Sequence, residues 1–197
     1  MEQAHNDVKM RILMAAKKLF AEKGYDGTTV REICEEAESN IALVSYYFGG
    51  KENVFFTLFD MFSPRKRIKL DEAMDDPVKG ISYIIGTMID YVYEEPLMIS
   101  IVQQELFLNG PRMNRISGYT SPVWLKLREL LENGREKGLF EFRSLDRAMI
   151  MIIAAIICPM KNPNMIDVCK EGNMLAEEIK QDTLDFVLYG LRYRRNN

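Results

Sequence analysis

The sequence from Gly24 to Val54 reads GYDGTTVREICEEAESNIALVSYYFGGKENV and contains two short helical segments bounded by polar residues and glycines. The first has apolar residues at helical spacing from Val30 to Ala37, with Thr28 as the expected N-cap. The second covers Ile41 to Phe48, with Asn40 as N-cap and a pair of glycines as its end. Two short helices joined by a tight turn are typical of a helix-turn-helix, whose second helix can enter the major groove of DNA.

Longer helices are predicted on both sides of this pair. Apolar residues on one helical face extend from Asp7 to Lys23, and Gly24 is the expected C-terminal stop. A fourth helix is expected over Lys51 to Phe62, and Ser63-Pro64 interrupts the chain after it. The sequence therefore predicts three helices in about the first fifty residues and a connecting helix behind them.

Polar and aromatic side chains gather on the third helix. Asn40, Ser45, Tyr46 and Tyr47 suit contacts with phosphates and base edges, and Lys51 follows at a helix start that favours a phosphate. The alternative interpretation places the tyrosines in the core and the lysine on the surface. Residue types alone leave both interpretations open.

Two patterns in this region are more specific. The pattern G-Y-x-x-T-T-V-R-x-I begins at Gly24, and Y-Y-F-x-x-K-E ends at Glu52. With them, the stretch from about Val8 to Phe59 resembles the N-terminal region of the TetR family of transcriptional regulators. The resemblance implies an all-helical homodimer, whose N-terminal helix-turn-helix binds a palindromic double-stranded DNA operator and whose C-terminal domain holds an effector pocket. It also implies that effector binding releases the DNA and relieves repression.

The resemblance assigns DNA contacts to the starts of the second and fourth helices and to the third helix. The implied contact residues are Thr28, Thr29, Asn40, Ile41, Ala42, Leu43, Ser45, Tyr46, Tyr47 and Lys51. The implied interior positions are Phe20, Ile33, Val44 and Phe48.

Four residues depart from the family pattern. Glu38 stands where a turn glycine is common, so we expect a strain of about 1 kcal/mol or a different closure of the turn. Ser39 replaces a small apolar residue, Ser45 replaces a frequent tyrosine, and Ile41 replaces a polar or basic side chain. Groove recognition would therefore depend on apolar contacts, for example with thymine methyl groups.

The predicted DNA-binding region carries no excess of positive charge. Residues 1 to 50 contain six basic and eight acidic residues, a net charge of −2. We therefore expect the acidic side chains Glu32, Glu35, Glu36 and Glu38 to face away from the duplex. Nonspecific affinity for DNA should be modest and sensitive to salt, and specificity should need a dimer.

The rest of the chain also reads as helices. Long helices are predicted to begin at Asp76-Pro77, to extend from Pro96 to Phe107, and to begin at Ser121-Pro122 after a loop with Gly118, the last of these with exits at Gly134 and Gly138. A further helix is predicted from Ser144 or Asp146 through Ala148–Ile157, and the final one from Asn173 to Arg192. A loop is predicted between these two, over Cys158–Asn164. The fold class is all-α with about nine helices. The predicted domains are a helix-turn-helix domain over 1–50, a connecting helix over 51–72, and an effector-binding and dimerisation domain over 73–197.

Dimerisation and effector binding are both assigned to this C-terminal part. The Ala148–Ile157 segment is apolar nearly all round, so the last two helices are expected to pair with their copies in a four-helix interface. A small apolar or aromatic effector is expected between residues 77 and 138, although core packing is the alternative role for each candidate. The candidates are Tyr83, Tyr91, Phe107, Met113, Tyr119 and Trp124.

Several function classes are disfavoured. The one histidine, His5, lies near the N-terminus, so catalysis by a Ser-His-Asp or Cys-His arrangement is close to excluded, and no enzyme, cofactor or metal is expected. The longest apolar run, Ala148 to Met160, is shorter than the roughly 18 residues of a membrane span, and the polar start does not resemble a secretory signal. A cytoplasmic location is expected.

Two functions remain at this point. The leading hypothesis is a dimeric, effector-responsive transcriptional regulator that binds DNA, most simply a repressor. The alternative is a helical dimer that senses a ligand or binds a protein without reading DNA. The unusual turn at Glu38-Ser39 keeps this alternative open.

Overall fold

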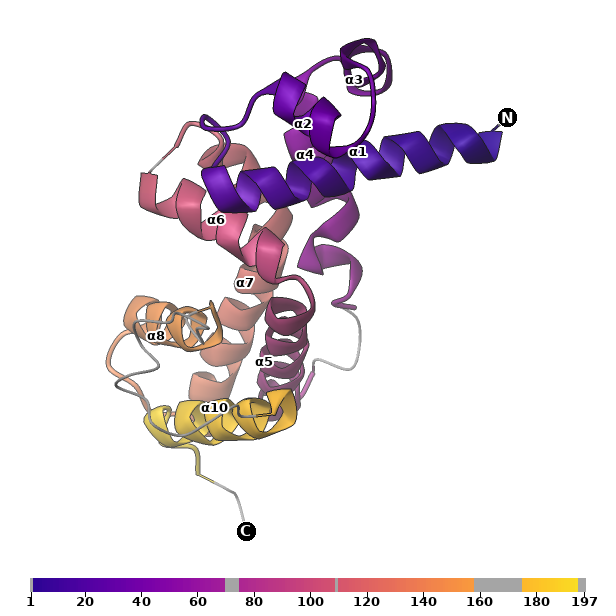
Figure 1. Ribbon diagram of the computed structural model, residues 1–197. Helices are drawn as coiled ribbons and strands as arrows, with labels where there is room; N and C mark the ends of the chain where they lie inside the picture. Colours follow the sequence, from indigo (N-terminus) through magenta and orange to yellow (C-terminus); the bar gives the residue numbers. More distant parts are fainter. Residues whose placement is uncertain (1, 70–74, 109, 158–174, 195–197) are drawn as a thin grey trace. The chain divides into compact units, whose positions relative to one another are not determined.

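The computed structural model describes residues 2–69, 75–108, 110–157 and 175–194 (Figure 1). Within these residues the chain forms nine α-helices and one short 3-10 helix, and no strand, so the all-α prediction is confirmed. The helices are α1 Glu2–Lys23, α2 Val30–Glu36, α3 Ile41–Phe48, α4 Lys51–Phe62, α5 Pro77–Glu94, α6 Pro96–Leu108, α7 Met113–Glu136, α8 Leu145–Ile157 and α10 Ala176–Gly190, and the 3-10 helix is η1 Pro64–Lys66.

Contacts divide the chain into two compact units. The first combines residues 1–63 with residues 95–120, and the second combines residues 64–94 with residues 121–197. Helix α7 supplies residues to both units. The domain boundaries predicted from the sequence, at residues 50 and 72, stay a prediction.

The first unit is built around α1. This helix contacts α2, α4 and α6, while α3 packs on α2 and α4. Phe20 of α1 and Phe55 of α4 form the centre of an aromatic cluster, with their ring centroids 5.3 Å apart. The expected interior residues Phe20, Ile33, Val44 and Phe48 are all buried, which confirms the core side of each of the first three helices.

The second unit is built around α5. Helices α8 and α10 both contact α5 and each other. The buried face of α5 includes Ile81, Ile84, Ile85 and Ile89, as its helical spacing predicts. A β-carbon at Gly80 would lie 2.8 Å from the side chain of Leu130, so the glycine permits close approach of α5 and α7.

Helix α7 corrects one sequence prediction. The expected loop around Gly118 is helical, and Pro122 lies inside the helix rather than at its start. A proline there removes one backbone hydrogen bond and normally favours a break. The apolar face nevertheless continues across it, because Ile116, Val123 and Leu127 are all buried at helical spacing. Tertiary burial thus outweighs the local signal.

Most other boundaries follow the predicted signals. Helix α4 ends at Phe62 before Ser63-Pro64, and Asp76 accepts hydrogen bonds from the backbone N–H groups of Val78 and Lys79 at the start of α5. Of the two predicted exits of α7, Gly134 lies inside the helix, which ends at Glu136 before Gly138. The predicted loop over 158–164 lies outside the described residues. Among the described helices, none combines the length and the hydropathy that crossing a membrane requires.

Candidate nucleic-acid interface

Helix α2 begins with a reciprocal cap. The hydroxyl of Thr29 accepts a hydrogen bond from the backbone N–H of Glu32, and the Glu32 carboxylate accepts one from the backbone N–H of Thr29 at 2.8 Å. The predicted cap at Thr28 was therefore wrong by one residue. The sequence holds the missed signal, because Thr29-x-x-Glu32 is a capping box.

Thr28 has a different role. Its side chain is 1% exposed, and its hydroxyl donates to the backbone carbonyl of Gly24 at 2.8 Å. This hydrogen bond closes the loop between α1 and α2. The burial of Thr28 leaves the exposed Thr29 as the better placed of the two predicted contact residues.

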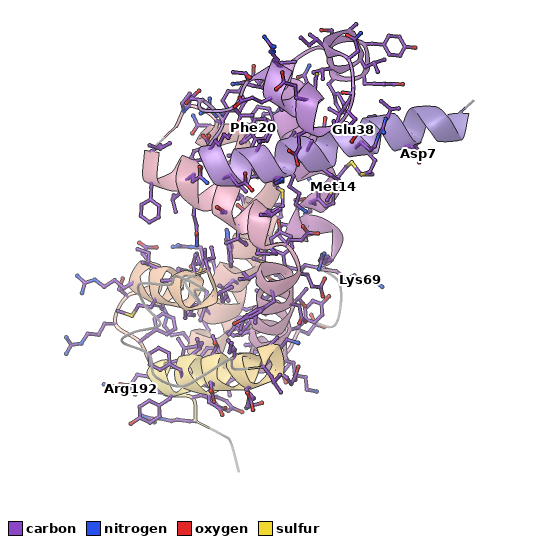
Figure 2. All side chains as sticks on the ribbon, viewed as in Figure 1. Asp7, Met14, Phe20, Glu38, Lys69 and Arg192 are labelled. Atoms are coloured by element: carbon purple, nitrogen blue, oxygen red, sulfur yellow. The ribbon has the colours of Figure 1, made fainter. Side chains whose placement is uncertain are left out.

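The turn between α2 and α3 contains the expected strain. Glu38 has a φ of 47°, in the left-handed region that favours glycine. The backbone N–H of Ser39 donates to the carbonyl of Cys34 at 2.9 Å, so the turn closes as helix C-termini commonly do when a glycine is present. Figure 2 shows Glu38 beside α1, and an open groove of about 450 Å³ there is lined by both Glu38 and Met14. The turn thus accommodates Glu38, at the position where the family commonly has a glycine, and stays closed.

Helix α3 is fixed at both ends. The Asn40 side chain accepts a hydrogen bond from the backbone N–H of Ala42 at 2.9 Å, and Gly49 ends the helix with a φ of 74°. One side of α3 buries Val44 and Phe48. Both predicted helix boundaries are confirmed.

The opposite side of α3 is exposed. Ile41 is 51% exposed and Tyr46 is 73% exposed, and Ala42 and Ser45 are also exposed. Because residues three and four apart share a helical face, these four side chains form one continuous surface. Leu43 and Tyr47 lie at its sides and are half-buried. We call Ile41, Ala42, Ser45 and Tyr46 the α3 face.

Lys51 is engaged by the protein backbone. Its ammonium group donates to the carbonyl oxygens of Tyr25 at 2.9 Å and Thr28 at 2.8 Å, and lies 4.1 Å from the centroid of the Tyr25 ring. Burial disfavours the charged form and lowers the pKa of Lys51. The lysine thus attaches the loop before α2 to the start of α4. Its expected contact with a phosphate stays a prediction.

The acidic residues of α2 are balanced locally. Each of the three forms an ion pair: Glu32 with Lys23, Glu35 with Arg31, and Glu36 with Lys18. The hydrogen bonds from Lys23 and Thr29 lower the pKa of Glu32 to about 2. These pairs neutralise the acidic surface of α2, and they also occupy cations that could otherwise attract phosphates.

The six predicted effector residues do not form one cluster. Phe107, Met113 and Tyr119 belong to the first unit, whereas Tyr83, Tyr91 and Trp124 belong to the second. Among the described residues, none of the six lines the open groove beside Glu38 or a smaller cavity of about 110 Å³ between α6 and the loop before α2.

One of the six is largely exposed, and three others have partners within the protein. Phe107 is 87% exposed. The Tyr119 hydroxyl donates to the Asp60 carboxylate at 2.8 Å. The Tyr83 hydroxyl accepts a hydrogen bond from the backbone N–H of Lys69 at 3.2 Å. The guanidinium of Arg67 lies over the ring of Tyr91, which is buried. Their assignment to an effector stays a prediction.

Comparisons with known proteins agree with this geometry. Residues 12–58 match the bacterial regulatory proteins of the tetR family, and residues 77–189 match the tetracyclin repressor-like C-terminal domain. The chain is 27% identical to the HTH-type transcriptional repressor NicS of Pseudomonas putida, over 92% of this chain and 91% of that protein. It is 38% identical over 55 residues to the HTH-type transcriptional regulator QacR of Staphylococcus aureus, which is 28% of this chain and 29% of that protein.

A solved structure shows the same fold. HlyIIR, a hemolysin II transcriptional regulator, aligns with a TM-score of 0.79 over 96% of this chain and 99% of that chain, at 24% identity. The two matched models together cover more than half of the chain, one on the helix-turn-helix and one on the C-terminal helices. The chain therefore belongs to the TetR family of bacterial regulatory proteins and is a DNA-binding transcriptional regulator.

Proposed function

We propose that this protein represses transcription by binding a palindromic operator as a homodimer in the cytoplasm, and that a small apolar or aromatic effector releases it. The observation that carries this proposal is the α3 face. It is exposed, free of acidic side chains, and held by a helix capped at both ends above a buried core. A short rigid helix with these properties can lie in a major groove.

Exposed apolar side chains in the second unit support dimerisation. On α8, Ile150 and Met151 are each 67% exposed, and on α10, Phe186 and Tyr189 are 71% and 87% exposed. Large apolar groups at this exposure are typical of surfaces that pair with another copy. Two-fold pairing would place two α3 faces about 34 Å apart, or a multiple of that, which suits a palindromic site.

Two aromatic side chains in the second unit support the effector part of the proposal. Tyr91 and Trp124 are buried and half-buried in the second unit, and both combine a large ring with a polar group. An effector that binds one arrangement of the dimer better than another would lower operator affinity by that difference. Catalysis is not part of the proposal, because the family consists of regulators.

The alternative of a helical dimer that does not read DNA loses its main support. It depended on the Glu38-Ser39 turn, which closes normally and leads into a capped α3. No observation in the described residues favours it over DNA binding.

Selection of DNA from a random pool by the wild-type protein tests the proposal. We expect enrichment of a two-fold symmetric motif, bound in fluorescence anisotropy more tightly than scrambled DNA. Tyr46→Ala should weaken binding to the selected DNA by about tenfold, because it removes the one aromatic ring of the α3 face, which is 73% exposed. Leu125→Ala, at a 65% exposed position on α7, is the matched control and should bind normally. Enrichment of no motif would contradict DNA recognition.

A further inference from the structure

Arg112 lies outside the helix-turn-helix and directly precedes α7. Its backbone carbonyl accepts hydrogen bonds from the N–H groups of Arg115 at 3.1 Å and Ile116 at 3.0 Å, so the residue forms part of the first turn of α7. The side chain is only 13% exposed. A guanidinium group this far buried needs specific partners.

Those partners lie in the loop between α1 and α2. The guanidinium of Arg112 lies 4.0 Å from the centroid of the Tyr25 ring, and its Nη2 donates to the Asp26 carboxylate at 3.2 Å. Tyr25 and Asp26 are followed within three residues by Thr29, the cap of α2. A single side chain therefore connects the start of α7 to the segment that positions α2.

A buried carboxylate fixes the orientation of Arg112. Glu105 of α6 is 3% exposed, and its Oε1 accepts a hydrogen bond from the Nε of Arg112 at 2.9 Å. A β-carbon at Gly110 would lie 2.5 Å from the Oε2 of Glu105, so the glycine leaves room for the carboxylate. Burial disfavours the charged guanidinium, but the hydrogen bonds and charges of Glu105 and Asp26 together outweigh it and raise the pKa of Arg112.

The same loop is held from α4 as well. Lys51 binds the carbonyl groups of Tyr25 and Thr28, and its ammonium also lies over the Tyr25 ring. Within the first unit, two cations from different elements thus contact one aromatic ring at the entrance to α2. Cation–π contacts that are shielded from water are among the stronger interactions of this kind.

We infer that Arg112 is a positioning residue for DNA binding, which holds the loop from Gly24 to Thr28, and with it the capped start of α2, against α6 and the first turn of α7. The residue does not need to touch DNA. The planar guanidinium stacks on the Tyr25 ring while its Nε donates to Glu105 and its Nη2 to Asp26, and the single ammonium group of a lysine cannot reproduce this combination. The expected effect of Arg112 on DNA affinity rests on the proposed function, whereas its contact with the loop does not.

Hydrogen exchange of the DNA-free protein tests the contact. In Arg112→Ala, the amides of Thr28 and Thr29 should exchange about tenfold faster, while those of α3 stay within about twofold of wild type. Equal acceleration throughout the first unit would overturn the inference, because it would show a general loss of stability. Arg128→Ala, which removes an arginine from an exposed ion pair on α7, is the control and should leave these amides unchanged.

A second variant provides the same test if Arg112→Ala does not fold. Arg112→Ala/Glu105→Gln removes the buried charge together with its partner, so no buried carboxylate is left without its arginine. It should show the same acceleration at Thr28 and Thr29. Wild-type exchange in this folded double variant would overturn the inference.

Binding to the DNA selected by the wild-type protein tests the consequence. The double variant should bind that DNA about tenfold more weakly and with an unchanged dependence on salt, because no phosphate contact is removed. A reduced salt dependence would instead place Arg112 on a phosphate and overturn its positioning role. If the wild type selects no DNA motif, the proposed function fails, whereas the exchange experiment still decides the role of Arg112 in the loop.

Discussion

Lys17 of α1 forms an ion pair with Glu95, the residue that precedes α6, and the two side chains are 6% and 13% exposed. The ammonium group also lies 4.0 Å from the centroid of the Phe62 ring at the end of α4. One lysine therefore joins three elements of the first unit. Burying such a pair carries a desolvation penalty that offsets much of the attraction between the charges. Removal of only one partner is nevertheless strongly destabilising, because it leaves the other charge buried.

Lys17→Met should lower the free energy of unfolding by about 3 kcal/mol, because the largely buried carboxylate of Glu95 then loses the ammonium group of Lys17. Lys17→Met/Glu95→Gln should recover most of this loss, since the charge is removed as well. Urea unfolding followed by circular dichroism measures both. A double variant no more stable than the single variant would show that another contact of the ammonium group, such as the one with the Phe62 ring, and not the charge pair, is responsible.

Lys51 gives a second prediction for stability. Lys51→Met should cost about 1 to 2 kcal/mol, because two carbonyl groups of the loop before α2 lose a charged donor. Lys126→Met removes a lysine that pairs with Glu129 at the surface and should cost less than about 0.5 kcal/mol. Equal losses in the two variants would mean that the backbone contacts of Lys51 contribute little to stability.

Local signals predicted much of the fold. Asn40 and Gly49 marked the ends of α3, and Asp76-Pro77 marked the start of α5. Each signal works through backbone groups within a few residues, so the sequence carries it whatever surrounds the helix. The buried faces of the first three helices and of α5 were equally readable, because apolar spacing reports which side is covered.

Long-range contacts explain what the sequence did not predict. Lys51 bonds to carbonyl groups 26 and 23 residues away, and Arg112 reaches an aspartate 86 residues away. No spacing rule relates such positions. The continuity of α7 through Pro122 was missed for the same reason, since the burial that stabilises it comes from packing in both units.

Glu38 provides a test of backbone strain. Glu38→Gly should raise the free energy of unfolding by about 0.5 to 1 kcal/mol, because glycine adopts a positive φ without a steric cost. Glu38→Ala removes the same charge but keeps the β-carbon, so it should give no such gain. Equal stabilisation by both substitutions, measured in urea, would assign the effect to the charge of the glutamate.

Glu32 should make the cap of α2 sensitive to acid. Its pKa falls from 4.5 to about 2 in the folded protein through hydrogen bonds from Lys23 and Thr29. A carboxylate with a depressed folded pKa stabilises the fold above its unfolded pKa, and the contribution disappears as the pH falls toward the folded value. The thermal midpoint of the wild type should therefore exceed that of Glu32→Gln at pH 6, and the gap should narrow between about pH 4.5 and 2.

The control for this measurement is Glu129→Gln, because Glu129 is the more exposed partner of an ion pair with Lys126 in α7. Its difference from wild type should stay small across the same range of pH. If the difference in thermal midpoint between wild type and Glu32→Gln stayed constant down to pH 2, ionisation of Glu32 would not be what stabilises the cap.

Ile150 offers a direct test of the proposed dimer. The side chain is 67% exposed on α8, so Ile150→Glu should leave the fold of one subunit intact. In a dimer interface the same glutamate would be buried without a counter-charge, at a cost of several kcal/mol. Sedimentation velocity should therefore show a shift from dimer to monomer, with unchanged helical circular dichroism.

Leu125→Glu introduces the same charge at a similarly exposed site on α7 and should remain dimeric. If Ile150→Glu becomes monomeric, its affinity for the selected DNA should also fall, because each half-site would then be bound without help from the other. A variant that stays dimeric would move the interface away from α8. A monomer that keeps full affinity would contradict the requirement for two paired α3 faces.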